Sequence, residues 1–342
     1  MNINQLIREN IAAMKPYSSA RDEFSGLDGL FLDANENPYN NGVNRYPDPY
    51  QNDLKSVLAE LKGVAAKNMM LGNGSDEVLD LLFRAFCEPK QDNVVITAPS
   101  YGMYKVLANL NNVELKEVLL EEDFSLNADK ILEVVDENTK LILLCSPNNP
   151  TGNVIDFEVI ERLLNNTNCL VVVDEAYIDF STKVSCIEKL SEYNQLVVSQ
   201  TLSKYYGMAG IRLGMCFASE DIIAILNRIK PPYNVNSLTQ NKAIDILKNK
   251  NERYKNEVIE ERELLSKSLA KLPFVLKVYP SEANFVLIKT TDATGIYNQL
   301  IKKQIVIRNR TKEPLCENCL RITVGTPEEN QLLIAALKEI KL

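Results

Sequence analysis

Four short apolar runs, each followed by a polar cluster, constrain the fold of this chain more than any other feature. The runs span residues 93–99, 140–147, 169–173 and 195–199, and helix-like segments alternate with such runs along the chain. Continuous apolar runs of this length are typical of strands buried on both faces of a parallel sheet. Ligands bind at the carboxyl ends of the strands in such sheets. The sequence therefore predicts an α/β fold with one pocket formed by four clusters, Ser100–Tyr101, Asn148–Gly152, Asp174–Tyr177 and Thr201–Lys204.

Another short apolar run leads into the glycine-rich stretch Gly72–Asp76, which includes Gly74 and Ser75. An amphipathic helix-like segment follows it, with apolar residues at helical spacing at Val78, Leu79, Leu82, Phe83 and Phe86. Free N–H groups and the helix dipole point to one place at such a helix start, so the stretch predicts a phosphate cradle. It matches neither the Walker A loop nor the G-x-G-x-x-G pattern, and a plain strand-to-helix turn is the alternative.

The stretch TLSKYYGMAGIRLG, residues 201–214, places Lys204 between hydroxyl residues and a glycine-rich run. A buried lysine near another cation loses its proton easily and becomes a nucleophilic amine. Such an amine forms Schiff bases with carbonyls, most often with the aldehyde of pyridoxal phosphate. Thr201, Ser203 and Arg212 would then hold the cofactor's phosphate. The alternative is a lysine on a solvated loop.

The other strand-end clusters suit the same cofactor. Asp174 follows an apolar run directly, where its carboxylate can keep a pyridine nitrogen protonated; a helix N-cap is its alternative role. Tyr177 and Asn149 can donate hydrogen bonds to the oxygen beside the aldehyde. Tyr101 can stack its ring on the pyridine face.

Charge and composition exclude several classes of partner. The net charge of −8 and a pI near 5.0 argue against nucleic acid and anionic membranes. No signal peptide or run of membrane-spanning length is recognisable, so we expect a cytoplasmic protein. Seven cysteines in mostly apolar runs suit a reducing compartment. Cys316 and Cys319 form a C-x-x-C, but a zinc site needs two more ligands and the chain has no histidine, so no metal is expected.

A chain of 342 residues is expected to fold as a large domain with a smaller one. We expect an N-terminal arm with part of the small domain over residues 1–44, the large domain over 45–232, and the C-terminal small domain over 233–342. Pro231–Pro232 mark the link, and a long solvated helix is predicted over residues 238–272. Short strands with helices between them follow, an α+β pattern. Arg308 and Arg321 lie on the last two of these predicted strands, and we expect them to bind an anion. Arg310 is interpreted as a salt-bridged surface arginine.

Six motifs in this order carry a resemblance over nearly the whole chain: GNGSDE, SYGMYK, SPNNPTGN, DEAYIDF, TLSKYYGMAGIRLG and LRITVGT. The set resembles class II aminotransferases of fold type I, and among them it is most similar to the histidinol-phosphate aminotransferase family, which shares RYPDP. The resemblance implies a pyridoxal 5'-phosphate domain with a mostly parallel seven-stranded sheet, plus a small α+β domain built from both chain ends. It also implies a homodimer whose active sites are shared between subunits.

Carried over by position, the resemblance implies a role for each motif residue. Lys204, Asp174 and Tyr177 are the catalytic set. The cofactor would be bound by these three and by Gly74, Ser75, Asp76, Tyr101, Asn149, Thr201, Ser203 and Arg212, with Tyr46 supplied by the neighbouring subunit. The substrate would be bound by Tyr17, Asn35, Arg308 and Arg321. Tyr205–Tyr206, where relatives often carry alanine-phenylalanine, is a local departure that reshapes the pocket wall at most.

The implied reaction is the ping-pong interconversion of L-histidinol phosphate and 2-oxoglutarate with imidazole acetol phosphate and L-glutamate, a step of histidine biosynthesis. A guanidinium at Arg321 would serve both the carboxylate and the phosphate of these small-molecule substrates. An aromatic amino-acid aminotransferase and a threonine-phosphate decarboxylase of the same fold remain alternatives. A regulatory module without catalysis is another class of function, although no basic or helix-turn-helix segment precedes the arm.

Overall fold

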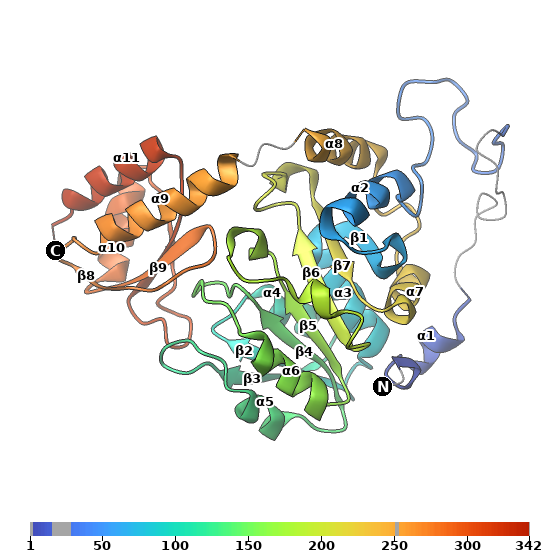
Figure 1. Cartoon of the computed structure of the whole chain (residues 1–342), viewed down its shortest axis with the longest axis horizontal. Coiled ribbons are helices and arrows are strands. Elements are labelled where there is room, and N and C mark those ends of the chain that lie inside the picture. Colours follow the sequence, from blue (N-terminus) through green and yellow to red (C-terminus); the bar gives the residue numbers. More distant parts are fainter. Residues whose placement is uncertain (1–2, 16–28, 250–252, 342) are drawn as a thin grey trace.

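The structure is a computed structural model that describes residues 3–15, 29–249 and 253–341. The described part of the chain forms two units, each built on its own sheet (Figure 1). The larger sheet has seven strands in the order β1-β7-β6-β5-β4-β2-β3. They are β1 (Met69–Asn73), β2 (Asn93–Ala98), β3 (Glu114–Leu119), β4 (Thr139–Cys145), β5 (Leu170–Asp174), β6 (Leu196–Thr201) and β7 (Leu213–Phe217). Only β7 runs antiparallel to its neighbours, so the predicted mostly parallel sheet is confirmed.

Helices cover both faces of this sheet, because its central strands are apolar on both sides. In β5, Val172 packs into the core under one face, while Val171 and Val173 pack into the core under the other. The first core contains side chains of α3 (Gly74–Phe86), α4 (Met103–Leu110) and α7 (Glu220–Ile229). The second contains side chains of α2 (Asn52–Lys62), α5 (Ala128–Val134), α6 (Phe157–Asn166) and α8 (Ser237–Lys248).

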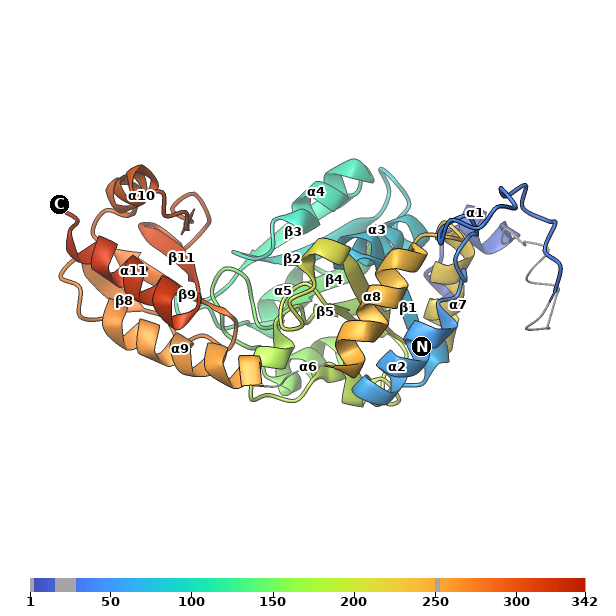
Figure 2. The ribbon, with the colours of Figure 1, turned by 90° about the horizontal axis from the view of Figure 1, so that it is seen from above.

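The smaller unit has four antiparallel strands in the order β10-β11-β9-β8. They are β8 (Val275–Val278), β9 (Phe285–Thr290), β10 (Arg308–Asn309) and β11 (Cys319–Thr323). Its core is closed by α9 (Arg253–Leu269), α10 (Ala293–Lys302) and α11 (Pro327–Lys338), which lie together at one end of the molecule (Figure 2). No helix among the described residues is long and apolar enough to cross a bilayer.

The charge pattern predicts one solvated helix over residues 238–272, and this prediction is wrong. The structure has two helices there: α8 packs against α2 of the larger unit, and α9 packs against β9 and α11 of the smaller one. Arg262 on α9 is buried and donates from Nη1 to the backbone oxygen of Ala283 at 3.0 Å. Each helix carries apolar residues that need a core, and these decide its position.

Residues 1–44 are predicted to contribute to the small domain, but the described residues at the start of the chain lie elsewhere. Ile3 and Leu6 are buried in the core of the larger unit beside α3 and α7. α1 (Glu9–Ala13) lies far from α9–α11 (Figure 1). The smaller unit is therefore not built from both chain ends, as far as these N-terminal residues are concerned, because their apolar side chains are taken up by the larger core.

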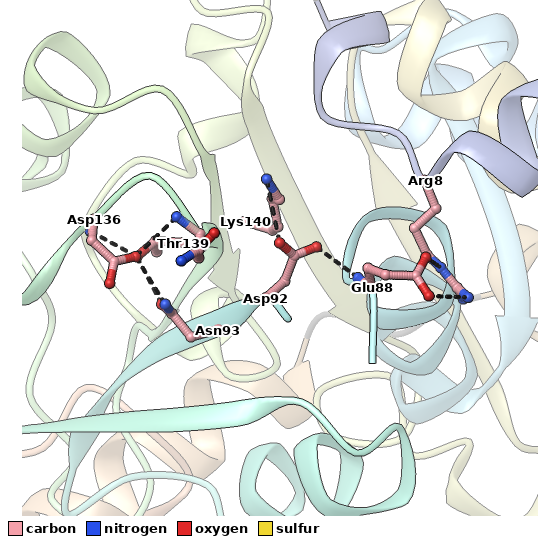
Figure 3. A network of polar contacts seen from close by, with 8 residues as sticks. Arg8, Glu88, Asp92, Asn93, Asp136, Thr139 and Lys140 are labelled. Carbon is pink, nitrogen blue, oxygen red and sulfur yellow. Dashed lines mark hydrogen bonds and ion pairs between the residues drawn. The ribbon is translucent and has the colours of Figure 1, made fainter. Parts of the chain in front are cut away.

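Polar contacts attach this N-terminal segment to the amino ends of β2 and β4, the edge opposite the predicted pocket. Arg8 donates from Nε to Glu88 Oε2 at 2.9 Å, and the Glu88 amide donates to Asp92 Oδ2 at 2.6 Å (Figure 3). Asp92 also pairs with Lys140 at 3.4 Å. The network fixes the segment on the sheet without reaching the site.

Candidate active site

The polar clusters that follow β2, β4, β5 and β6 meet in one pocket at the carboxyl edge of the large sheet. The pocket is lined by Gly74, Ser75, Asp76, Tyr101, Cys145, Asn149, Asp174, Ala176, Tyr177, Thr201, Ser203, Lys204 and Arg212. Every residue predicted to bind a cofactor except Tyr46 is in this set. Parallel strands end at the same edge, so residues far apart in sequence converge there.

One end of the pocket has the features of an anion site. α3 begins at Gly74 without a side-chain cap; the Gly74 amide donates to the Arg212 backbone oxygen at 2.9 Å, and the next N–H groups of the first turn, from Ser75 on, are open to an anion. Gly74 has φ +74°, and a Cβ there would lie 2.6 Å from Arg212 Nη2, so only glycine lets the guanidinium lie against the backbone. Ser203 Oγ is buried and lacks a hydrogen-bond partner within the described chain. An oxyanion would supply that partner.

Asp76 reduces the positive charge at this end. Its Oδ2 lies 3.5 Å from Arg212 Nη2, and its Oδ1 accepts a hydrogen bond from Tyr101 Oη at 3.1 Å. Burial, followed by the charge of Asp76, raises the pKa of Tyr101. The tyrosine therefore remains a neutral donor beside the carboxylate.

Asp174 lies on the pocket floor, at the end of β5. Burial raises the pKa of its carboxyl to about 6, although hydrogen bonds to Tyr104 and to the Ala176 amide oppose the shift. Tyr104 Oη donates to Asp174 Oδ2 at 2.9 Å, and Tyr104 is fully buried. Tyr104 and Cys145 belong to this site, although neither is among the predicted site residues. The signal for Tyr104 was its position three residues after Tyr101, in the first turn of α4, where its ring meets that of Tyr101 edge to face at 5.6 Å.

Replacing Tyr104 with phenylalanine is expected to lower kcat about tenfold, because Asp174 loses a donor to its charged form. The pKa of Asp174 should rise further, and the acid limb of the kcat–pH profile should move to higher pH. The matched control is Tyr193→Phe, since Tyr193 Oη donates to Glu161 Oε1 at 2.6 Å away from the pocket. An unmoved acid limb in Tyr104→Phe would show that Tyr104 does not act on this carboxyl.

Lys204 lies in the turn that follows β6. The prediction that it is buried is wrong for the single chain, in which the residue as a whole is exposed. Its Nζ, however, lies 5.7 Å from the centre of the Tyr177 ring and so points into the pocket. Partial burial, then the charges of Arg321 and Arg212, lower the pKa of the Lys204 amine, while Asp174 and Asp76 oppose this. The amine is thereby shifted toward its nucleophilic form.

The smaller unit places Arg321 of β11 against Asn149, one of the residues that line the pocket. Arg321 Nη1 donates to Asn149 Oδ1 at 2.5 Å, and its guanidinium lies 5.2 Å from the centre of the Phe285 ring. Burial, then the charge of Arg310, lowers the pKa of Arg321 to about 10. Tyr177 meets the same phenylalanine edge to face at 5.1 Å. A cation in this half-desolvated place attracts an anion strongly.

A second contact holds the two units together close to the pocket. The Glu282 amide donates to the Gly152 backbone oxygen at 2.8 Å, and Glu282 Oε2 accepts from the Thr182 amide at 3.1 Å. A Cβ on Gly152, which has φ +85°, would lie 2.5 Å from Ser281 Oγ. Because Gly152 belongs to the same loop as Asn149, this contact fixes the position of Arg321 relative to the pocket.

Four predicted residues in the described part of the chain do not line this pocket: Arg321, which touches it through Asn149, the exposed Arg308 opposite Arg321 on β10, Tyr46 and Asn35. Tyr46 is 50% exposed and stacks on Tyr233 with ring centres 4.5 Å apart. Asn35 is exposed, has φ +53° and lines a separate surface groove with Tyr46. Tyr17 lies outside the described residues. A single chain thus brings together the cofactor residues but not Tyr46 or Asn35.

The fold and the pocket agree with what comparison with known proteins finds. Residues 32–337 match the family model "Aminotransferase class I and II". The histidinol-phosphate aminotransferase of Flavobacterium johnsoniae is 60% identical over 98% of both chains. The solved histidinol-phosphate aminotransferase of Clostridium acetobutylicum superposes with a TM-score of 0.79 at 25% identity, over 86% of this chain and 90% of that one.

A further solved structure carries a ligand. It is the histidinol-phosphate aminotransferase of Sinorhizobium meliloti in complex with pyridoxal-5'-phosphate, with a TM-score of 0.79 at 26% identity, over 86% of this chain and 82% of that one. The match spans both units of the described chain. The chain belongs to the histidinol-phosphate aminotransferase family of class I and II aminotransferases.

Proposed function

We propose that this chain transfers an amino group between L-histidinol phosphate and 2-oxoglutarate, with imidazole acetol phosphate and L-glutamate as products. The observation that carries the proposal is the pocket in which the Lys204 amine, the buried carboxylate of Asp174 and the anion site at the start of α3 meet. The 60% identity to a full-length histidinol-phosphate aminotransferase supports the substrate assignment.

The residues of the pocket fit pyridoxal 5'-phosphate. Ser203 Oγ, Arg212 and the first turn of α3 would hold the phosphate, and the buried Ser203 hydroxyl would gain the partner it lacks. Asp174 would hold the pyridine nitrogen, and Tyr177 with Asn149 would hold the ring oxygen. When bound, the cofactor supplies an electron sink for the carbon that loses its proton.

Lys204 would hold the cofactor and then move the proton. Its amine is shifted toward the neutral form by partial burial, Arg321 and Arg212, as a general base near neutral pH requires. No histidine exists in the chain to replace it. Asp174, whose pKa is raised by burial, would have a protonated ring nitrogen as its partner, which would offset the cost of burying its charge.

We propose that Arg321, with Arg308 as its cross-strand neighbour, binds the anionic end of the substrate. The hydrogen bond from Arg321 to Asn149 links this end to the cofactor end of the pocket. Tyr17 and Asn35 complete the substrate site in this proposal, by the positional match to the family.

The test compares histidinol phosphate, phenylalanine and threonine phosphate, each with 2-oxoglutarate. We expect the highest kcat/KM for histidinol phosphate, measured by glutamate formation. A higher value for phenylalanine would make the chain an aromatic aminotransferase. Release of carbon dioxide from threonine phosphate without glutamate formation would make it a decarboxylase.

We also propose a homodimer with shared active sites, in which Tyr46 reaches the cofactor phosphate of the neighbouring subunit. The segment from residue 30 to residue 50 and the start of α8 expose large apolar side chains, namely Leu30, Leu32, Tyr39, Val43, Tyr46, Tyr50 and Leu238. Monomers rarely expose so many apolar groups in one region. The exposure of Lys204 in the single chain has the same explanation, because a partner would cover it.

In such a dimer, Tyr46→Phe is expected to weaken pyridoxal phosphate binding about 10-fold to 100-fold, since a hydrogen bond to a charged group is lost. The affinity is measured by cofactor titration. Mixing Tyr46→Phe chains with Lys204→Ala chains should restore full-affinity sites, because each mixed dimer has one site with both native residues. A monomer by sedimentation, or no gain on mixing, would contradict the shared site.

A further inference from the structure

Arg310 lies within the arginine cluster of the substrate site. Arg308 and Arg321 are directly opposed across β10 and β11, and the Arg310 amide donates to the Cys319 backbone oxygen at 2.9 Å. Positions two residues apart on a strand share a face, so all three arginines are on the side of the small sheet that Arg321 presents to the pocket. Like charges opposed in this way destabilise a sheet unless an anion lies between them.

The side chain of Arg310 is not that of a surface arginine. It is 25% exposed, and its Nε is buried without a hydrogen-bond partner in the described chain. Its charge is the largest electrostatic contribution to the lowered pKa of Arg321, ahead of that of Arg308, and it also acts on Tyr177. The predicted salt bridge exists, but it is loose: Nη1 lies 3.5 Å from Glu313 Oε1.

The two substrates of the proposed reaction need different amounts of positive charge. A carboxylate carries one negative charge, whereas a phosphate monoester carries between 1.5 and 2 near pH 7, as is typical of such groups. Among the described residues, Arg321 has no carboxylate partner: it donates to the Asn149 amide, packs on the Phe285 ring and faces Arg308 across the strand pair. It is therefore sufficient for a carboxylate. A phosphate can use one more cation than Arg321 and Arg308 supply, and Arg310, whose Nε is buried without a hydrogen-bond partner in the described chain, lies diagonally across the strand pair from Arg321.

We propose that Arg310 is a specificity-determining residue that binds the phosphate of the substrate but not the one glutamate carboxylate that takes the same place beside Arg321. Glu313 neutralises Arg310 when a carboxylate or no anion is bound, and the phosphate displaces Glu313 when it enters. One site can thus take both substrates in turn. This inference rests on the proposed function, because it assumes that a phosphate substrate uses this pocket.

The experiment measures the two half-reactions separately in the cofactor-loaded enzyme, one with histidinol phosphate and one with glutamate. Arg310→Gln should lower kcat/KM for histidinol phosphate roughly 10-fold to 100-fold, mostly through KM, as expected for loss of a charge-assisted hydrogen bond. The value for glutamate should change less than about threefold. Arg310→Lys should recover part of the loss, because lysine restores the positive charge but not the paired N–H donors of a guanidinium.

Two further variants serve as comparisons. Glu313→Gln removes the competing carboxylate and should lower KM for histidinol phosphate. Arg162→Gln removes the same charge from an exposed arginine that pairs with Asp129, and it should change neither half-reaction. Equal losses for both substrates in Arg310→Gln, or no loss for either, would overturn the proposal.

Inorganic phosphate separates this inference from the proposed function. It should inhibit the glutamate half-reaction competitively, and its inhibition constant should rise in Arg310→Gln by the same roughly 10-fold to 100-fold factor. The native enzyme could fail to use histidinol phosphate while its inhibition by phosphate still depends on Arg310. In that case the substrate assignment is wrong, but the proposal that Arg310 binds a phosphate group is supported. If Arg310→Gln leaves the inhibition by phosphate unchanged, the proposal that Arg310 binds a phosphate group is refuted.

Discussion

Lys204→Ala is expected to lower kcat for amino transfer by about 10⁴-fold or more, the largest effect of any single substitution in this chain. The variant loses the amine that holds the cofactor and also acts as the general base that moves the proton. Because one amine has both roles, its removal abolishes both. The chain has no histidine that could act instead. The measurement is single-turnover amino transfer from glutamate. Borohydride treatment and mass spectrometry should show cofactor attached covalently to the native chain and not to the variant.

Lys204→Arg is the control for charge. It keeps a cation beside Tyr177, but a guanidinium does not lose its proton near neutral pH, so it should be as inactive as alanine. Lys67→Ala, which removes an exposed lysine paired with Glu220, should leave the rate unchanged. Substantial activity in Lys204→Arg would mean that this position contributes only charge, and the proposed chemistry would have to change.

Asp174→Asn is expected to lower kcat about 10³-fold, the second largest effect. The amide can accept a hydrogen bond but cannot stabilise a positively charged ring nitrogen, so a preorganised electrostatic contribution is lost. Tyr104 and the Ala176 amide would still position the side chain, so the pocket should keep its shape. The measurement is kcat with both substrates, which should fall equally. A loss for only one substrate would place Asp174 in substrate binding.

The same variant should be more stable than the native chain in the absence of cofactor. Burial raises the pKa of Asp174 from 3.8 to about 6, so the folded chain holds this proton more tightly than the unfolded chain. The contribution of Asp174 to stability is therefore most favourable below about pH 4 and is lost as pH rises through about 6. At pH 7 the cost is about 3 kcal/mol, from a shift of roughly two pKa units.

Asp174→Asn should recover about 1–3 kcal/mol of unfolding free energy at pH 7.5 and much less at pH 4.5. Urea unfolding of the cofactor-free protein at the two pH values measures this difference. Equal changes at both pH values would indicate a packing effect in place of a buried charge. The native residue thus costs stability until its ligand is present, as is common at functional sites.

The amino-acid sequence by itself determined the large sheet and the composition of the cofactor pocket. Runs such as residues 169–173 are apolar at every position, so they can lie only in a sheet covered on both faces, and polar residues directly after them must lie at its edge. The site residues Asp174, Asn149 and Ser203 could be predicted because each follows an apolar run within a few residues, and this spacing can be read directly from the sequence. The helix start at Gly74 was identifiable for the same reason.

Only the tertiary structure decided which long-range neighbours these residues have. The Tyr104 hydroxyl bonds Asp174 because segments 70 residues apart pack together, Arg310 lies beside Arg321 because β10 pairs with β11, and Lys204 is exposed because the surface around it is left open. The N-terminal residues and α8 joined the larger unit for the same reason. Their own periodicity predicts an apolar face but does not specify which core will bury it.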